Sequence, residues 1–197
     1  MSIKIAFFDF DGTVTKSDSL IGFIQYAVGK PSYYFGLLSM SPVLALYKLN
    51  IISNHLAKEK LLNHFFNGWD AVHFKKIADQ YAVEQIDTII RPRAMEKIRW
   101  HQAEGHEVVI VSASIESWMK KWCKNNKIHL IATRLETNKG KLTGKFSTKN
   151  CYGIEKVNRI EKKFNLSHYS TIYAYGDSLG DEAMLNIATE RYYRYFE

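Results

Sequence analysis

The stretch IKIAFFDFDG, residues 3–12, decides the fold. Its first six residues, 3–8, are apolar with a single lysine among them, which predicts a strand buried on both faces, as in a parallel sheet. Two carboxylates, Asp9 and Asp11, follow this strand directly, and Gly12 comes next. Because ligands of open α/β sheets bind at the carboxyl ends of the strands, we expect these acids at a functional site.

A long helical block follows this first strand. From Ser17 to about Ile90 apolar residues recur at helical spacing, and no strand signal interrupts them. The first helix of the block is expected to end at Gly29, since glycine commonly closes helices. We therefore predict that residues 16–90 form an all-helical cap inserted after the first strand.

An alternating pattern of strands and helices begins after this block. Three short apolar strand signals lie at residues 108–111, 128–132 and 171–175. Strands that alternate with helices are typical of a doubly wound parallel sheet, so the fold class is α/β. We predict one catalytic core built from residues 1–15 and 91–197, with a β-hairpin at 140–146 and a last strand near 192–196.

The composition indicates which class of partner and which cellular compartment to expect. The net charge of +7 favours an anionic partner, such as a phosphate ester or an anionic lipid surface. No run of five basic residues occurs, so nucleic acid is not expected. The two cysteines, Cys123 and Cys151, are too few for a disulfide framework, and the N-terminus lacks a cleavable signal pattern. We expect a cytoplasmic protein, and one hypothesis places it at the inner face of the membrane.

Polar side chains follow three of the predicted strands, and a lysine begins a later helix. These residues are Asp9, Asp11, Ser112, Asp177, Asp181 and Lys156. Crowded carboxylates need a cation in order to stay ionised together, and hard oxygen ligands suit Mg²⁺. One carboxylate can attack phosphorus, and a second can act as acid and base. A hydroxyl and an ammonium group can bind phosphate oxygens, so the set predicts Mg²⁺-dependent phosphoryl transfer.

Four segments resemble, in order, the motifs of the haloacid dehalogenase superfamily. They are DFDGTVT at residues 9–15, VSAS at 111–114, CYGIEKV at 151–157 and GDSLGD at 176–181. The helical insertion directly after the first motif resembles the C1-capped branch of subfamily IB, which includes the phosphoserine phosphatases. The resemblance spans essentially the whole chain. It implies a Rossmann-like core, a C1 cap and a phosphatase acting on phosphomonoesters.

The resemblance also implies roles for individual residues. Asp9 is expected to attack phosphorus and form an aspartyl-phosphate, while Asp11 protonates the leaving oxygen and later activates water. The phosphoryl group is expected to be held by Gly12, Ser112, Ala113 and Lys156.

The same resemblance implies a metal site. Asp9, the backbone carbonyl of Asp11, and Asp177 are expected to ligate Mg²⁺, and Asp181 is expected to support them.

The oddest part of the predicted cap is residues 31–47, PSYYFGLLSMSPVLALY. These 17 residues carry no charge, are shorter than a standard transmembrane helix, and lie between Lys30 and Lys48. One interpretation is a buried helical hairpin, and another is a surface that contacts the interface of an anionic membrane. The motif layout together with this segment resembles bacterial phosphatidylglycerophosphatase C-type enzymes. Our hypothesis is therefore a phosphomonoester on a lipid, such as phosphatidylglycerophosphate.

Three alternatives stay open. Asp18 lies where phosphoserine phosphatases carry an acidic residue that meets the substrate amine, although a helix N-cap explains it equally well. The motifs also depart from those of the phosphoserine phosphatases at Gly12, Ala113 and Gly180, which argues against phosphoserine as the substrate. The others are a non-catalytic phospho-acceptor, of the kind found in signalling receiver domains, and a membrane-associated binding module. The oligomeric state is left open.

Overall fold

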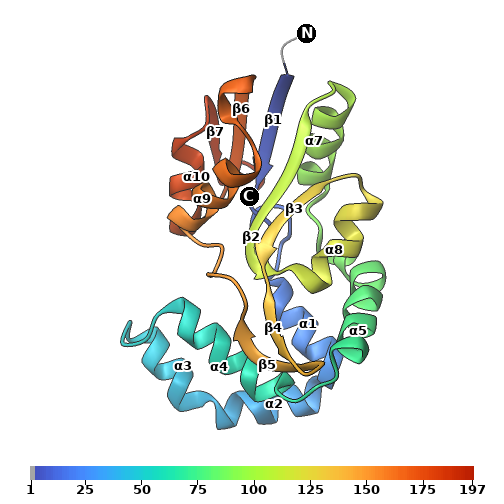
Figure 1. Ribbon diagram of the computed structural model, residues 1–197, viewed down its shortest axis with the longest axis vertical. Coiled ribbons are helices and arrows are strands. Elements are labelled where there is room, and N and C mark those ends of the chain that lie inside the picture. The colour runs from blue at the N-terminus through green and yellow to red at the C-terminus, as the bar shows by residue number, and fades with distance from the viewer. Residues whose placement is uncertain (1–2) are drawn as a thin grey trace.

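The computed structural model describes residues 3–197. It contains a five-stranded parallel sheet whose strands are ordered β3-β2-β1-β6-β7. The strands are β1 (Ile3–Phe8), β2 (Glu107–Ile115), β3 (His129–Thr133), β6 (Tyr169–Gly176) and β7 (Glu190–Tyr193). Figure 1 shows this sheet in one lobe and most of the helices of the first half of the chain in a second lobe beneath it. The predicted α/β class is confirmed.

The central strand β1 is buried on both faces, as its sequence predicts. Ile5 and Phe7 face one hydrophobic cluster, and Ala6 and Phe8 face the other, because successive side chains of a strand point to opposite sides. All four are fully buried. This alternation places β1 in the middle of the sheet, with β2 on one side and β6 on the other.

Helices cover both faces of the sheet. The face of Ala6 and Phe8 is covered by α7 (Pro92–Ala103) and α8 (Glu116–Asn125), and the face of Ile5 and Phe7 is covered by α9 (Ile154–Lys163) and α10 (Glu182–Asn186). Two short 3₁₀ helices, η1 (Leu166–His168) and η2 (Leu179–Asp181), flank β6. The amphipathic spacing of these segments brings Ile98 and Trp118 to one face and Ile160 and Met184 to the other. The sheet is therefore doubly wound.

The helical block predicted between β1 and α7 is also present. Its helices are α1 (Ser19–Val28), α2 (Lys30–Ser39), α3 (Ser41–Lys48), α4 (Asn54–Phe66), α5 (Ala71–Glu84) and α6 (Ile86–Ile89). Gly29 ends α1 with a φ of +79°, a conformation that glycine adopts without steric cost. Phe23 of α1 packs against Phe66 and Phe74 of this lobe and stacks on Trp118 of α8 at 4.6 Å between ring centroids. An aromatic cluster thus joins the two lobes.

A β-hairpin from the second half of the chain packs with the helical lobe. It consists of β4 (Leu135–Asn138) and β5 (Lys141–Phe146). The Leu142 N–H donates to Trp69 O at 2.9 Å, and Gly68 N–H donates to Leu142 O at 2.8 Å. The hairpin was predicted at about this place in the sequence, but its pairing with the chain after α4 is a long-range contact that local patterns do not reveal. The limits 1–15, 16–90 and 91–197 remain predictions, and residues 1–2 lie outside the described part.

Two strand bounds differ from the prediction. Strand β2 runs past Ser112 to Ile115, with a shift in its register against β3 between these residues. Strand β7 covers Glu190–Tyr193 instead of 192–196. The Arg194 N–H makes the last bond of the ladder, to the Gly176 carbonyl, and the strand ends there because Arg194 takes a φ of +52°, which is not extended.

Residues 31–47 form parts of α2 and α3 and are largely exposed. Tyr33 and Gly36 are the buried residues of α2, and α3 buries none. Phe35 is 80% exposed and Leu38 is 71% exposed. The structure therefore favours a surface segment over a buried hairpin. Within residues 3–197, no helix combines the length and apolar character that crossing a bilayer requires.

A buried histidine in the core gives a prediction about stability. His101 of α7 is fully buried, with its Nδ1 2.8 Å from His106 Nδ1 and its Nε2 2.9 Å from the Tyr175 hydroxyl. Burial, assisted by the charges of His106 and Lys97, lowers the pKa of His101 from 6.5 to about 3. The unfolded chain therefore binds more protons between these two pH values, and stability falls as the pH drops below 6.5. We expect His101 to account for a loss of about 2 kcal/mol between pH 7 and pH 5.

Urea unfolding at the two pH values measures this contribution. A His101→Gln variant should be less stable at pH 7 but should lose about 2 kcal/mol less than the wild type on going to pH 5. An identical pH response in both proteins would show that His101 does not titrate as described.

Candidate active site

The carboxyl ends of the parallel strands point toward the helical lobe (Figure 1). Asp9 follows β1, Ser112 lies near the end of β2, and Asp177 follows β6. Because neighbouring parallel strands end at the same edge of a sheet, these residues meet although more than sixty positions separate them in sequence. Lys156 reaches the same edge from the first turn of α9.

Lys156 is the centre of this group of side chains. Its Nζ donates to Asp9 Oδ1 at 2.6 Å, to Asp181 Oδ1 at 2.6 Å and to the Val111 carbonyl at 2.7 Å. The lysine is almost completely buried. Burial alone lowers its pKa, but the two neighbouring carboxylates raise the pKa of Lys156 above its usual value. The side chain is therefore a fixed positive charge beside Asp9.

Asp9 is itself buried at this edge. Burial raises the pKa of Asp9 to about 7, against the opposing effect of Lys156, and the charge of Asp181 raises it further. A single ammonium group thus balances only part of the negative charge gathered around it.

Three carboxylates form a cluster that could hold a cation. Asp9, Asp177 and Asp181 each offer an oxygen, and these oxygens lie within 4.8 Å of one another. Asp177 is oriented by the Thr13 hydroxyl, which donates to its Oδ1 at 2.8 Å. Three carboxylates against one lysine leave an excess of negative charge, and such hard oxygen donors fit a divalent cation of the Mg²⁺ type.

The third member of the cluster is positioned from its own loop. Asp181 Oδ2 accepts hydrogen bonds from the Ser178 N–H at 3.0 Å and the Ser178 hydroxyl at 2.8 Å. It also accepts one from the Asp177 N–H at 3.2 Å. The loop that carries both aspartates is therefore closed on itself, which fixes their separation.

Gly12 allows the acidic loop to approach the first motif. Its φ is +90°, and a Cβ added there would lie 2.4 Å from Asp177 Oδ2. Any other residue would be strained in this conformation and would displace the aspartate. The Gly12 N–H donates to Thr15 Oγ1 at 3.4 Å, and the predicted contact of this amide with phosphate stays a prediction.

Asp11 is turned away from the acidic cluster. Its Oδ1 accepts from the Ser19 N–H at 2.7 Å, and its Oδ2 accepts from the Ser114 hydroxyl at 2.6 Å. Burial and the charge of Asp18 raise the pKa of Asp11 to about 6, although the hydrogen bonds from Ser114 and Ser19 oppose this. The side chain is thus held near the site without joining the cluster, so the metal contact predicted for Asp11 could be made by its backbone carbonyl alone.

The second motif lies in the last part of β2, where the register against β3 shifts. The buried Ser112 hydroxyl accepts from the Ser114 N–H at 3.0 Å. The Ala113 carbonyl accepts from the Thr133 hydroxyl at 3.2 Å and from Lys58 Nζ at 3.4 Å. Lys58 belongs to α4, so a basic side chain of the helical lobe reaches the backbone of the predicted phosphate-binding motif.

Sequence reasoning missed Lys58. It is one of 27 lysine and arginine residues, and it lies in no motif. Only the tertiary placement of α4, which packs against β5, distinguishes Lys58 from the other lysines.

Asp18 is the N-cap of α1. Its Oδ1 accepts from the Leu20 N–H at 2.8 Å and from the Ile21 N–H at 3.2 Å. The helix-capping interpretation is therefore confirmed, and a contact with substrate stays a prediction.

The chain is similar to several known proteins. A family model described as haloacid dehalogenase-like hydrolase matches residues 6–186. Protein CicA of Caulobacter vibrioides is 34% identical over 191 residues, covering 96% of this chain and 85% of that protein. A probable phosphatase of Mycobacterium tuberculosis is 29% identical over 191 residues, covering 91% of this chain and 64% of that protein.

Solved structures share the fold. A protein of unknown function from Bordetella pertussis superposes with a TM-score of 0.81 at 21% identity, covering 96% of this chain and 88% of that one. A phosphoserine phosphatase solved as a phospho-aspartyl intermediate analogue gives a TM-score of 0.66 at 19% identity, covering 95% and 84% of the two chains. At these sequence identities, the similarity shows a shared fold and nothing about the activity.

Proposed function

Because the chain belongs to the haloacid dehalogenase-like hydrolase family, we propose that it hydrolyses phosphomonoesters in a Mg²⁺-dependent reaction through a phosphorylated Asp9. One observation carries this proposal. The buried Lys156 ammonium donates to Asp9 and to Asp181 of the acidic cluster at 2.6 Å each, and to the carbonyl of Val111, the residue before Ser112. A carboxylate held between a lysine and a cation site is suited to attack phosphorus.

The two aspartates of the first motif divide the chemistry. The Asp9 carboxylate attacks phosphorus, and the bond to the leaving oxygen breaks as Asp11 donates its proton to that oxygen. Asp11 then takes a proton from the water that attacks the aspartyl-phosphate, which releases phosphate and restores Asp9. The hydrogen bonds from Ser114 and Ser19 hold Asp11 in place, and its pKa of about 6 suits a group that gives and takes a proton near neutrality.

The remaining motif residues bind the phosphoryl group and the metal ion. Lys156 and Ser112 hold the phosphoryl oxygens, together with the amides of Gly12 and Ala113. Mg²⁺ would be held by Asp9, Asp177, Asp181 and the Asp11 carbonyl. When bound, it neutralises the phosphate oxygens that otherwise repel an attacking carboxylate.

Apolar side chains support a lipid phosphate as the substrate. Leu179, two residues after Asp177, is 80% exposed, and Tyr152 packs beside Gly180 of the same loop. The surface of α2 and α3 exposes further apolar side chains between Lys30 and Lys48. An apolar rim and an apolar surface edged with lysines suit a phosphomonoester embedded in an anionic membrane, such as phosphatidylglycerophosphate at the inner face of the bilayer.

A small phosphomonoester such as phosphoserine is the second candidate. The favouring observation is that Asp18 lies close enough to influence the pKa of Asp11. Its carboxylate oxygen is occupied as a helix cap, however, which leaves less of it for a substrate amine. A phospho-acceptor without turnover does not need a second carboxylate held like Asp11, and a binding module does not need the acidic cluster.

Phosphate release from a two-sided panel tests the substrate. We expect Mg²⁺-dependent turnover of phosphatidylglycerophosphate and phosphatidic acid in mixed micelles to exceed that of phosphoserine and sugar phosphates by at least about tenfold, because apolar contacts add a few kcal/mol of binding. Chelation of the metal should remove activity on both sides.

A double variant separates the apolar surface from the catalytic chemistry. Phe35→Ser with Leu38→Ser should lower turnover of the lipids presented in vesicles and leave the turnover of a small ester unchanged. The matched control is Val72→Ser with Val83→Ser on α5, which removes two exposed apolar side chains elsewhere. A preference for phosphoserine in the panel would overturn the lipid proposal, and no Mg²⁺-dependent release from any ester would overturn the phosphatase.

A further inference from the structure

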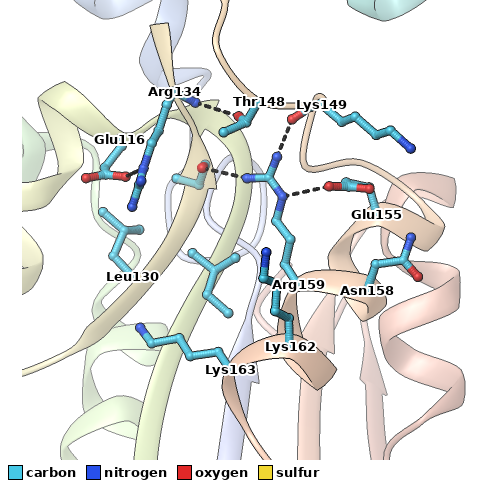
Figure 2. A pocket seen from close by; sticks show the side chains of 12 residues that line it. Glu116, Leu130, Arg134, Thr148, Lys149, Glu155, Asn158, Arg159, Lys162 and Lys163 are labelled. Atoms are coloured by element: carbon cyan, nitrogen blue, oxygen red, sulfur yellow. Dashed lines mark hydrogen bonds and ion pairs between the residues drawn. The ribbon is translucent and has the colours of Figure 1, made fainter.

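A hollow of about 460 Å³ lies at the open edge of the sheet, away from the residues of the catalytic proposal. It is bounded by β3, by α9 and by both linkers that connect the core to the β4–β5 hairpin (Figure 2). Its charged lining residues are Arg134, Lys149, Arg159, Lys162, Lys163, Glu116 and Glu155. Five of these are basic and two are acidic, so the hollow is strongly positive.

The two acids are already paired with the two arginines. Arg134 Nε lies 2.5 Å from Glu116, and Arg159 Nε lies 2.9 Å from Glu155. The three lysines form no ion pair within residues 3–197. In Figure 2 the Lys162 and Lys163 side chains extend from α9 along the hollow, whereas the Lys149 ammonium points outward. Two of the uncompensated charges therefore border the same space.

The walls of the hollow are braced by hydrogen bonds. Arg159 is half-buried and donates to the Ala132 carbonyl at 2.8 Å and to the Lys149 carbonyl. The first linker is joined to the second because the Arg134 N–H donates to the Thr148 hydroxyl at 3.1 Å. Edge strand, helix and linkers are thus held together before any ligand arrives, which lowers the ordering cost of binding.

We propose that this hollow is a second anion site, which binds a small, multiply charged phosphate compound separately from the catalytic centre. Ammonium groups that form no ion pair repel one another, and an anion of the phosphate or diphosphate class relieves this with charge-assisted hydrogen bonds. The volume lies within the range of pockets that bind small molecules. Lys156 lies on the same helix, but its ammonium is buried and engaged by Asp9 and Asp181.

Inorganic pyrophosphate titrated into ¹⁵N-labelled protein at low salt, with no Mg²⁺, tests the site. We expect saturable shifts of the amide signals of Lys149, Asn158 and Lys162. Lys162→Gln with Lys163→Gln should weaken this response at least tenfold. The control, Lys121→Gln with Lys124→Gln, removes the same charge from the exposed face of α8 and should change it less than twofold.

The outcomes separate this site from the catalytic one. Binding at the catalytic centre appears at the amides of Gly12 and Ser112 and should be equal in both double variants, so a failed phosphatase proposal leaves this test intact. Absent shifts at the hollow, or equal weakening by both variants, would overturn the proposal. Vesicles of anionic lipid should bind both variants alike. A loss of vesicle binding in the first variant without a pyrophosphate response would assign the lysines to lipid headgroups instead.

Discussion

Replacing Asp9 by asparagine is expected to lower phosphomonoester turnover by about 10³-fold or more while the chain stays folded. An amide has no negative charge with which to attack phosphorus, so no covalent intermediate forms. The fold should tolerate the change because Lys156 keeps its contacts with Asp181 and the Val111 carbonyl. Steady-state phosphate release measures the loss, and circular dichroism with thermal melting checks the fold.

Asp70→Asn is the matched control for this substitution. Asp70 caps α5 through the His73 N–H, and asparagine caps helices about as well as aspartate. The control should therefore keep both activity and stability. Near-complete activity in Asp9→Asn would show that another group is the nucleophile.

Replacing Lys156 by methionine is expected to have the largest effect on stability. The variant leaves Asp9 and Asp181 buried without their common counter-charge. Removing one partner from a buried ion pair typically costs about 3–5 kcal/mol, and turnover should fall with it because the phosphoryl group loses its ammonium contact. The free energy of unfolding from urea titration measures the first effect without reference to activity.

The loss of unfolding free energy in Lys156→Met should depend on pH in a definite direction. Without the lysine, the pKa of Asp9 rises further above its unfolded value. The pKa of Asp181, which burial raises but Lys156 holds below its usual value, rises as well. A raised folded pKa makes stability fall as the pH rises, so the deficit against the wild type should be larger at pH 7 than at pH 4. Lys76→Met, an exposed lysine on α5, is the control and should change the unfolding free energy by less than about 1 kcal/mol. A deficit equally small in Lys156→Met would contradict the buried ion-pair network.

Local patterns sufficed for the core of the fold. The apolar run of β1 predicts a strand buried on both faces, and the structure places it in the middle of the sheet. The polar residues after β1, β2 and β6 meet because parallel strands end at one edge, so the clustering of Asp9, Ser112 and Asp177 follows from element type and order alone. The sequence pattern predicts Lys156 among these residues as a phosphate-binding group, but it does not predict the direct contacts of Lys156 with Asp9 and Asp181.

Other features depend on contacts between distant segments. The direction of the Asp11 carboxylate is decided by Ser19 and Ser114, and the approach of Lys58 to Ala113 is decided by the packing of α4 against β5. Likewise, hydrophobic spacing shows that α2 and α3 are helices but does not show whether any neighbour covers them.

There is a physical reason why local sequence patterns predict some features of this protein and not others. Periodicity and turn chemistry act over a few residues, so the sequence by itself determined the strands, the helices and the edge at which the acids gather. Packing joins residues that the chain separates by tens of positions, and its outcome depends on the shapes of whole elements. Tertiary structure alone therefore decided that the β4–β5 hairpin pairs with the helical lobe, and that five basic side chains come together at the sheet edge.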